Sequence, residues 1–323
     1  MYRKITAIVI PTLIAIAIIL YMLGSVKDQL LDALIHIVPE YLAAAMGICL
    51  LAWWLRGWRY HTILAGMDDK VSVRTATGCI FVSQTVNLIV PFRIGDVVRI
   101  FILNHENDIS YSDGISSIVV ERIFDIITVA LLGLIALPFV LRASGNPAYI
   151  YAMALVVILG IFFFIFLFFS DRLKSENRYL RIILSMLHEI RRASLTPRSI
   201  VLLGCSSLVI WMLDVLVCLS VILMFRQEMA FPTVVFAIVV GNLIKAVPIT
   251  PGGMGTYEFL VAQTLSLAGM PDVYAKLVAI IDHLIKNLIT VAGGIISMYL
   301  FGDWVIPNIK KAWNNRLDRG DSS

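Results

Sequence analysis

Six uninterrupted apolar stretches determine what kind of fold this chain can adopt. Each is long enough for an α-helix to cross the hydrocarbon core of a bilayer, which takes about 20 residues. The stretches cover residues 5–24, 41–60, 114–140, 149–169, 200–225 and 275–301. Hydrophobic residues make up 59% of the chain and charged residues only 15%, whereas a soluble domain carries about 25% charged residues. The sequence therefore predicts an all-α integral membrane protein with six full spans.

Two further apolar segments are interrupted in the middle. Residues 75–103 contain the run Val90-Pro91-Phe92-Arg93-Ile94-Gly95-Asp96, and residues 231–268 contain Pro251-Gly252-Gly253-Met254-Gly255. Proline and clustered glycines end helices. A broken backbone at membrane depth is tolerated only where protein or water surrounds it. Each segment is therefore expected to be a helix–break–helix unit inside the protein.

The distribution of Lys and Arg predicts the orientation of the chain. Most basic residues fall on the cytoplasmic side if the N-terminus is cytoplasmic, with Arg56 and Arg59 assigned to a loop over 56–74 and others to a basic loop over 171–198. This assignment makes 75–103 begin and end in the cytoplasm and 231–268 begin and end outside. Both segments are shorter than the roughly 40 residues that two crossings need. We expect two oppositely oriented re-entrant helical hairpins in the cell (cytoplasmic) membrane, with both termini cytoplasmic.

The two interrupted segments also resemble each other. Asn87-Leu88-Ile89 precedes the first break, and Asn242-Leu243-Ile244 precedes the second. We therefore expect one transmembrane domain over 1–323 that contains an inverted repeat, with units of about 75–140 and 231–301. In transporters with such repeats the substrate site lies near the midplane, where broken helices meet.

Charged residues within the apolar segments are the candidate site residues, because a charge at membrane depth is costly unless it is paired or functional. Arg93 and Arg99 flank the first break, and two guanidinium groups can clamp a phosphate. The glycines of the second break offer backbone amides for the same purpose, or form a tight packing turn. The predicted substrate-binding set is Arg93, Asp96, Arg99, Glu121, Arg122, Asp125, Lys245, Pro251, Gly252, Gly253, Gly255, Glu258, Asp282, His283 and Lys286.

Helical spacing predicts contacts within this set. Glu121 and Asp125 share a helix face beside Arg122, and Asp282 and Lys286 are four residues apart. Some of these groups are expected to form purely structural salt bridges, and Asp214 is expected to bond a neighbouring helix. No metal, cofactor or catalytic residue is expected. Nucleic-acid binding is not expected either, because no basic groove with interleaved aromatic residues is present.

Three motifs resemble a known family. Pro91-Phe92-Arg93-Ile94-Gly95-Asp96-Val97-Val98-Arg99, Val120-Glu121-Arg122-Ile123-Phe124-Asp125 and Thr250-Pro251-Gly252-Gly253-Met254-Gly255-Thr256-Tyr257-Glu258 are similar to segments of the flippase-like, lysylphosphatidylglycerol synthase transmembrane-region family. The family commonly has Glu where Asp96 stands. The resemblance implies a membrane protein that moves a lipid head group across the bilayer. The full-length synthases add a soluble aminoacyl-transfer domain, and the chain ends at Ser323, so aminoacyl-lipid synthesis is not expected to carry over.

Three functions follow as hypotheses. The first is a flippase-like protein that translocates an anionic phospholipid or a polyprenyl-phosphate-linked sugar, so that its partners are membrane lipids. The second is a membrane-embedded glycosyl or phospholipid transferase, in which Asp96, Glu121 or Asp125 would supply a carboxylate. The third is an accessory subunit of a cell-envelope glycosylation pathway.

Overall fold

The computed structural model describes residues 2–90, 93–144, 196–246 and 250–302, and these ranges contain helices and turns but no β-strand. The prediction of an all-α protein is therefore confirmed. The predicted span over 149–169 lies outside the described residues, as does almost all of the basic loop over 171–198.

Four helices in the described part of the chain are long and apolar enough to cross a membrane. They are α3 (Pro39–Ala65), α6 (Tyr111–Ser144), α9 (Pro197–Met224) and α12 (Asp272–Phe301). They coincide with four of the six predicted spans. At the N-terminus, the first predicted span lies within α1 (Tyr2–Gly24), which meets α2 (Lys27–Ile35) at a bend of 60°. Counted as one span, this bent pair gives a fifth crossing among the described residues.

Both interrupted segments form pairs of short helices. The first is α4 (Val73–Ile89) and α5 (Ile94–Asn107); the second is α10 (Phe231–Ala246) and α11 (Thr256–Leu267), joined through the 3₁₀ turn η2 (Pro251–Gly253). The members of each pair pack against one another. None of the four helices exceeds 17 residues, which is less than the length of about 20 that crosses a membrane.

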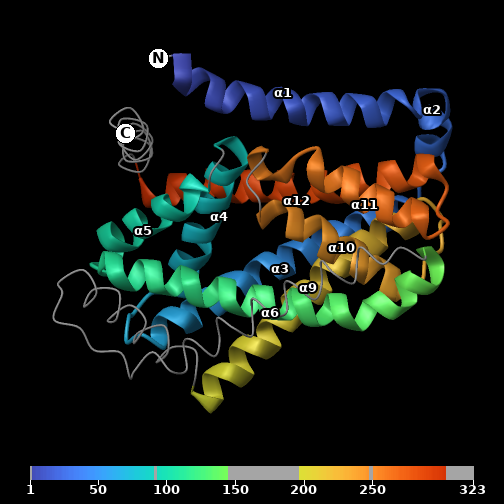
Figure 1. The fold of residues 1–323 in the computed structure, drawn as a ribbon. Helices are drawn as coiled ribbons and strands as arrows, with labels where there is room; N and C mark the ends of the chain where they lie inside the picture. Colours follow the sequence, from blue (N-terminus) through green and yellow to red (C-terminus); the bar gives the residue numbers. More distant parts are fainter. Residues whose placement is uncertain (1, 91–92, 145–195, 247–249, 303–323) are drawn as a thin grey trace.

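The long helices run alongside one another, and the two short pairs occupy different ends of the bundle (Figure 1). The α4–α5 pair lies at the end where α12 finishes, and α10 and α11 lie toward the other end. The two pairs nevertheless meet, because η2 packs against α4. Helix α1 runs along the outside of the bundle and contacts η2 and α11.

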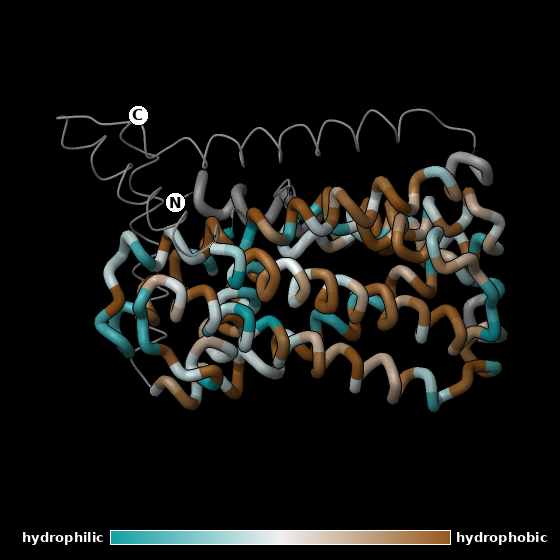
Figure 2. Tube along the Cα trace, turned by 90° about the horizontal axis from the view of Figure 1, so that it is seen from below, coloured by the Kyte–Doolittle hydropathy of each residue, from teal (hydrophilic) through white to brown (hydrophobic). Residues whose placement is uncertain are grey.

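The surface of the bundle suits a lipid environment. Hydrophobic residues extend along its middle, and hydrophilic residues gather at its two ends and at some interior positions (Figure 2). Large apolar side chains on α6 and α12 face outward, among them Ile135, Phe139, Leu288 and Ile296. Exposed apolar surface of this extent marks contact with a membrane. The chain is an integral membrane protein.

Candidate functional site

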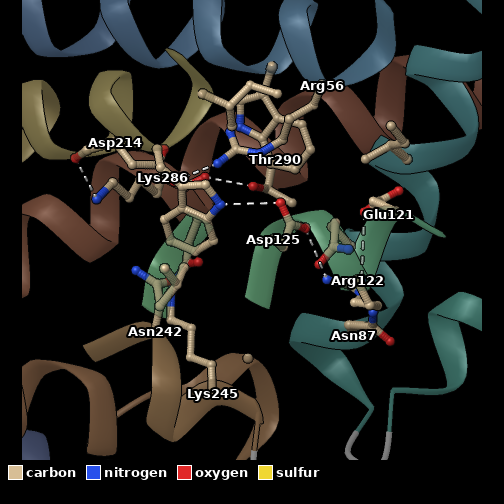
Figure 3. Close-up of a pocket in the computed structure, with 18 of the residues that line it drawn as sticks. Arg56, Asn87, Glu121, Arg122, Asp125, Asp214, Asn242, Lys245, Lys286 and Thr290 are labelled. Atoms are coloured by element: carbon tan, nitrogen blue, oxygen red, sulfur yellow. Dashed lines mark hydrogen bonds and ion pairs between the residues drawn. The ribbon is translucent and has the colours of Figure 1, made fainter. Parts of the chain in front are cut away.

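A cavity of about 280 Å³ lies in the middle of the bundle, and both helix breaks contribute to it. Arg93 comes from the first break and Gly252 from the second, while α3, α4, α6, α9, α10 and α12 supply the remaining walls. Arg122 and Asn87 lie on one side of this cavity, and Lys245 and Asn242 lie on the other (Figure 3). The two breaks also approach each other directly, because a Cβ atom on Gly252 would come within 2.4 Å of the Leu88 side chain.

Side-chain hydrogen bonds fix the backbone of the first break. The Asn87 side chain accepts from the Gly95 amide at 2.7 Å and donates to Asp96 at 3.3 Å. Gly95 lies so close to α4 that an added Cβ would come within 1.8 Å of the Ser83 carbonyl oxygen. The residue before α5, Arg93, adopts a left-handed conformation (φ 56°), and its side chain is 38% exposed. The turn therefore leaves the Arg93 guanidinium accessible.

Carboxylates around the first break are held by two buried arginines. Arg99, whose side chain is 0% exposed, donates to Glu121 at 2.7 Å. Arg59 on α3 donates to Asp125 at 2.7 Å. Arg122 lies 3.7–3.9 Å from Asp96, Glu121 and Asp125, and its Nε and one terminal nitrogen have no hydrogen-bond partner among the described residues. Arg122 therefore sits among carboxylates that other residues already engage.

A second group of charges lies around α12. Lys286 pairs with Asp282 at 2.7 Å, as its spacing predicted, and the Tyr257 hydroxyl donates to Asp282 at 2.6 Å. Arg56 on α3 pairs with Asp214 on α9 at 2.5 Å. Asp214 therefore links two helices, which agrees with its predicted structural role, although it also lines the cavity.

Lys245 differs from the other cavity cations. Its ammonium lies 4.0 Å from the centre of the Tyr257 ring, and it forms no ion pair with any described residue. A cation–π contact attracts a cation without neutralising it. Lys245 can therefore engage an anionic ligand without first breaking a salt bridge.

Most backbone amides of the second break are used internally. The Gly253 and Met254 amides donate to the carbonyls of Thr250 and Pro251, and the Gly255 amide donates to the Glu258 carboxylate at 2.7 Å. Glu258 in turn bonds His283 at 2.7 Å. The predicted cradle of free amides is therefore not present in this conformation, and the alternative, a tight packing turn, describes this break better.

The comparison with known proteins agrees with these motifs. A sequence model described as the lysylphosphatidylglycerol synthase TM region matches residues 8–294. The chain belongs to this family. The match includes both helix breaks and every residue that lines the cavity.

Several known proteins match most of this chain. The chain is 30% identical to "Glycosyltransferase AglD" of Haloferax volcanii over 92% of its own length, but it spans only 54% of that relative. It is 26% identical to a UPF0104 membrane protein of Methanocaldococcus jannaschii, over 67% of this chain and 93% of the relative. A UPF0104 membrane protein of Methanothermobacter thermautotrophicus is 22% identical over 94% of this chain and 98% of its own length.

The structure separates the predicted site residues of this family member into two groups. Those that line the cavity are Arg93, Glu121, Arg122, Asp125, Lys245, Gly252 and Lys286. Those outside the lining, most of them packed behind the wall, are Asp96, Arg99, Pro251, Gly253, Gly255, Glu258, Asp282 and His283.

The predicted anion clamp of Arg93 and Arg99 needs correction. Arg99 is fully buried between Glu121 and the Tyr60 ring and does not reach the cavity. Arg122 lines the cavity together with Arg93 instead. The sequence could not distinguish Arg99 from Arg122, because both lie close to charged partners along the chain.

The prediction that Arg56 and Arg59 lie in a loop is wrong. Helix α3 continues to Ala65, so both arginines lie inside a helix and line the cavity. Their spacing of three residues within an apolar helix was the available signal, because it places both on one face. Trp211 and Asn242 also line the cavity. Neither was predicted, because neither side chain is charged.

Proposed function

We propose that this chain binds the phosphate of a lipid head group in the cavity between the two helix breaks and passes it across the membrane. The observation that carries the proposal is that, within the described part of the chain, the cavity carboxylates are paired, whereas some of the cavity cations are not. Asp125 and Asp214 are held in ion pairs with Arg59 and Arg56. Among the described residues, Lys245 has no such partner and the donors of Arg122 are incompletely bonded. An anion is the ligand that this arrangement attracts.

The arrangement of the helices supports a route for the head group. We infer that α4–α5 and α10–α11 are re-entrant hairpins that enter from opposite sides, the first from the cytoplasm, and that the two form an inverted repeat. All four helices are too short to cross a membrane, and the two pairs lie at different ends of the bundle (Figure 1). Asn87 and Asn242 occupy equivalent places before the two breaks, and both line the cavity.

A translocation assay tests the proposal. The purified chain is reconstituted into vesicles that contain a fluorescent anionic phospholipid, and a membrane-impermeant quencher reports how much label reaches the outer leaflet. We expect label in vesicles with the protein to become accessible faster than in empty vesicles. Lys245→Met should abolish this gain, because the unpaired cation is lost while the side-chain length is kept.

Lys276→Met is the matched control. Lys276 lies at the start of α12, pairs with Asp272 and is not part of the cavity lining. Its variant should translocate lipid as the unmodified chain does. Translocation at the rate of empty vesicles by the unmodified protein, or equal loss in both variants, would contradict the proposal.

The alternative function is a membrane-embedded transferase, and it is supported by the name of the Haloferax volcanii relative, a glycosyltransferase. The chain covers only 54% of that relative, so the transfer chemistry of that protein can also reside in its unmatched part. Incubating the purified chain with a lipid phosphate and activated sugar donors distinguishes the two functions. Formation of a glycosylated lipid that Asp125→Asn abolishes would favour the transferase over the translocator.

A further inference from the structure

The cavity wall contains uncharged hydrogen-bonding groups that phosphate binding does not use. Gln84 on α4 and Asn287 on α12 both line it, and neither side chain makes a hydrogen bond within the described part of the chain. Asn242 on α10 donates to the Ile238 carbonyl at 2.8 Å, and its side-chain oxygen has no partner within the described ranges. Three different helices therefore present amide groups to one cavity. Asn87, in contrast, is occupied by the first break.

An amide side chain both donates and accepts hydrogen bonds. A hydroxyl group does the same, so a set of amides complements a ligand with several hydroxyl groups. An ammonium group would need free carboxylates instead. The three cavity carboxylates, Glu121, Asp125 and Asp214, already pair with arginines. The uncharged part of the cavity is thus suited to a polyhydroxyl group and poorly suited to an amine.

Trp211 supplies a flat apolar surface beside these amides. Its indole nitrogen donates to Asp125 at 3.2 Å, which fixes the orientation of the ring. No aromatic ring or cation lies over the Trp211 ring among the described residues. Trp53, in contrast, is stacked on Phe81 with a centroid distance of 4.5 Å and also contacts Arg56. Because Trp211 lines the cavity, its ring can pack against the C–H face of a cyclic polyol.

The size of the cavity limits what can bind. Its volume of about 280 Å³ lies just below the range of roughly 300–1,000 Å³ that is usual for small-molecule sites. One ring with one phosphate is of suitable size, whereas an oligosaccharide would have to extend beyond the cavity.

We propose that the head group is a phosphate bearing a single cyclic polyol, held at its phosphate by Lys245, Arg93 and Arg122 and at its ring by Trp211, Gln84 and Asn287. This inference rests on the proposed function and specifies its substrate class. Two kinds of lipid share this chemistry: a polyprenyl phosphate that carries one sugar, and a phospholipid with an inositol head group.

Binding of soluble head-group analogues to the purified full chain tests the inference. The probes are hexose 1-phosphate, inositol 1-phosphate, glycerol 1-phosphate and inorganic phosphate, measured by calorimetry. At least one ring phosphate should bind about tenfold more tightly than glycerol 1-phosphate, because the ring gains hydrogen bonds and the contact with Trp211. Whichever ring phosphate binds more tightly identifies the lipid class.

Variants assign this gain to the proposed residues. The double variant Gln84→Met/Asn287→Leu keeps side-chain size but removes both amides. It should reduce the affinity for the ring phosphate to that for glycerol 1-phosphate and leave the affinity for inorganic phosphate unchanged. Lys245→Met should weaken all four probes by a similar factor. Circular dichroism and thermal melting verify that each variant folds.

The outcomes separate this inference from the proposed function. If the unmodified chain binds all phosphates equally and Lys245→Met weakens all of them, the polyol inference is overturned and the anion site stands. If no phosphate binds to the unmodified chain, both the inference and the proposed function are contradicted. The comparison between probes on the unmodified chain decides the inference even if the double variant fails to fold.

Discussion

Arg99 and Glu121 form a buried ion pair that joins α5 to α6, with the guanidinium donating to the carboxylate at 2.7 Å and fully excluded from solvent. The pair lies directly behind the cavity wall, where Glu121 but not Arg99 is exposed to the cavity. Its position predicts that Arg99 supports the structure of the first break and does not bind the ligand.

Arg99→Met should therefore destabilise the protein. Removing one partner of a buried pair leaves an uncompensated charge and costs about 3–5 kcal/mol in soluble proteins. We expect a large decrease in melting temperature in detergent. Adding Glu121→Gln to the same chain should recover part of the loss, because the uncompensated carboxylate is removed. A chain with Arg99→Met that melts normally but no longer binds phosphate would instead place Arg99 in the ligand site.

Arg93→Gly should weaken phosphate binding without lowering the stability of the protein. Arg93 has φ 56°, and a left-handed conformation costs a residue with a side chain about 1–2 kcal/mol. Glycine adopts this conformation without that cost. The variant should therefore melt at the same or a slightly higher temperature, yet bind inorganic phosphate more weakly because a cavity cation is lost.

Asp108→Gly is the matched control for Arg93→Gly. Asp108 follows α5, has φ 54° and lies outside the cavity lining. Its variant should likewise melt at the same or a slightly higher temperature, without any change in phosphate affinity. A large loss of stability in Arg93→Gly alone would mean that the contact of the Arg93 side chain with Asp96, at 4.0 Å, matters more than backbone strain.

Much of this architecture could be predicted from the sequence because it depends on local properties. The four described long helices follow from runs of apolar residues, and both breaks follow from proline and glycine at their centres. In contrast, whether a charged side chain faces the cavity or lies behind its wall depends on packing between distant segments. Arg59, for example, meets Asp125 only because α3 crosses α6.

The basic residues of α3 show a second limit of prediction from the sequence. Counting Lys and Arg near the end of an apolar stretch assigned Arg56 and Arg59 to a loop, although α3 continues beyond them. Their partners, Asp214 and Asp125, lie on two other helices. A buried arginine with a distant partner is indistinguishable in sequence from a loop arginine.

Gly252→Ala should destabilise the second break. Gly252 has φ 60°, and an added Cβ would lie 2.4 Å from the end of the Leu88 side chain, where the two breaks meet. Leu88 can move aside, but the left-handed backbone remains unfavourable by about 1–2 kcal/mol. We expect a lower melting temperature together with weaker phosphate binding, since Gly252 lines the cavity.

Gly47→Ala should have the opposite effect on stability and serves as the control for Gly252→Ala. Gly47 lies inside α3, has no positive φ, and has nothing within 4 Å of an added Cβ. Alanine should stabilise this helix by about 0.5–1 kcal/mol. If both glycine variants shift the melting temperature in the same direction, conformational strain at the second break does not explain the requirement for Gly252.

Opposite insertion of the two hairpins can be tested by cysteine labelling. Cys49, Cys79 and Cys218 are buried and Cys205 is exposed, so Cys205→Ser gives a suitable background. His105, near the end of α5, is an exposed residue, as is Leu267 at the end of α11. A membrane-impermeant maleimide applied to intact cells should label Leu267→Cys, whereas His105→Cys should react only after the membrane is permeabilised.

Two further labelling sites, one before each hairpin, test whether each hairpin begins and ends on the same side of the membrane. Lys70 precedes α4 and Glu228 precedes α10, and both residues are exposed. A re-entrant segment begins and ends on one side, so Lys70→Cys should behave as His105→Cys does, and Glu228→Cys as Leu267→Cys does. If the two members of either pair react from opposite sides, that segment crosses the membrane completely. The two breaks would then no longer be tips of opposed hairpins, and the head group would need a different route through the cavity.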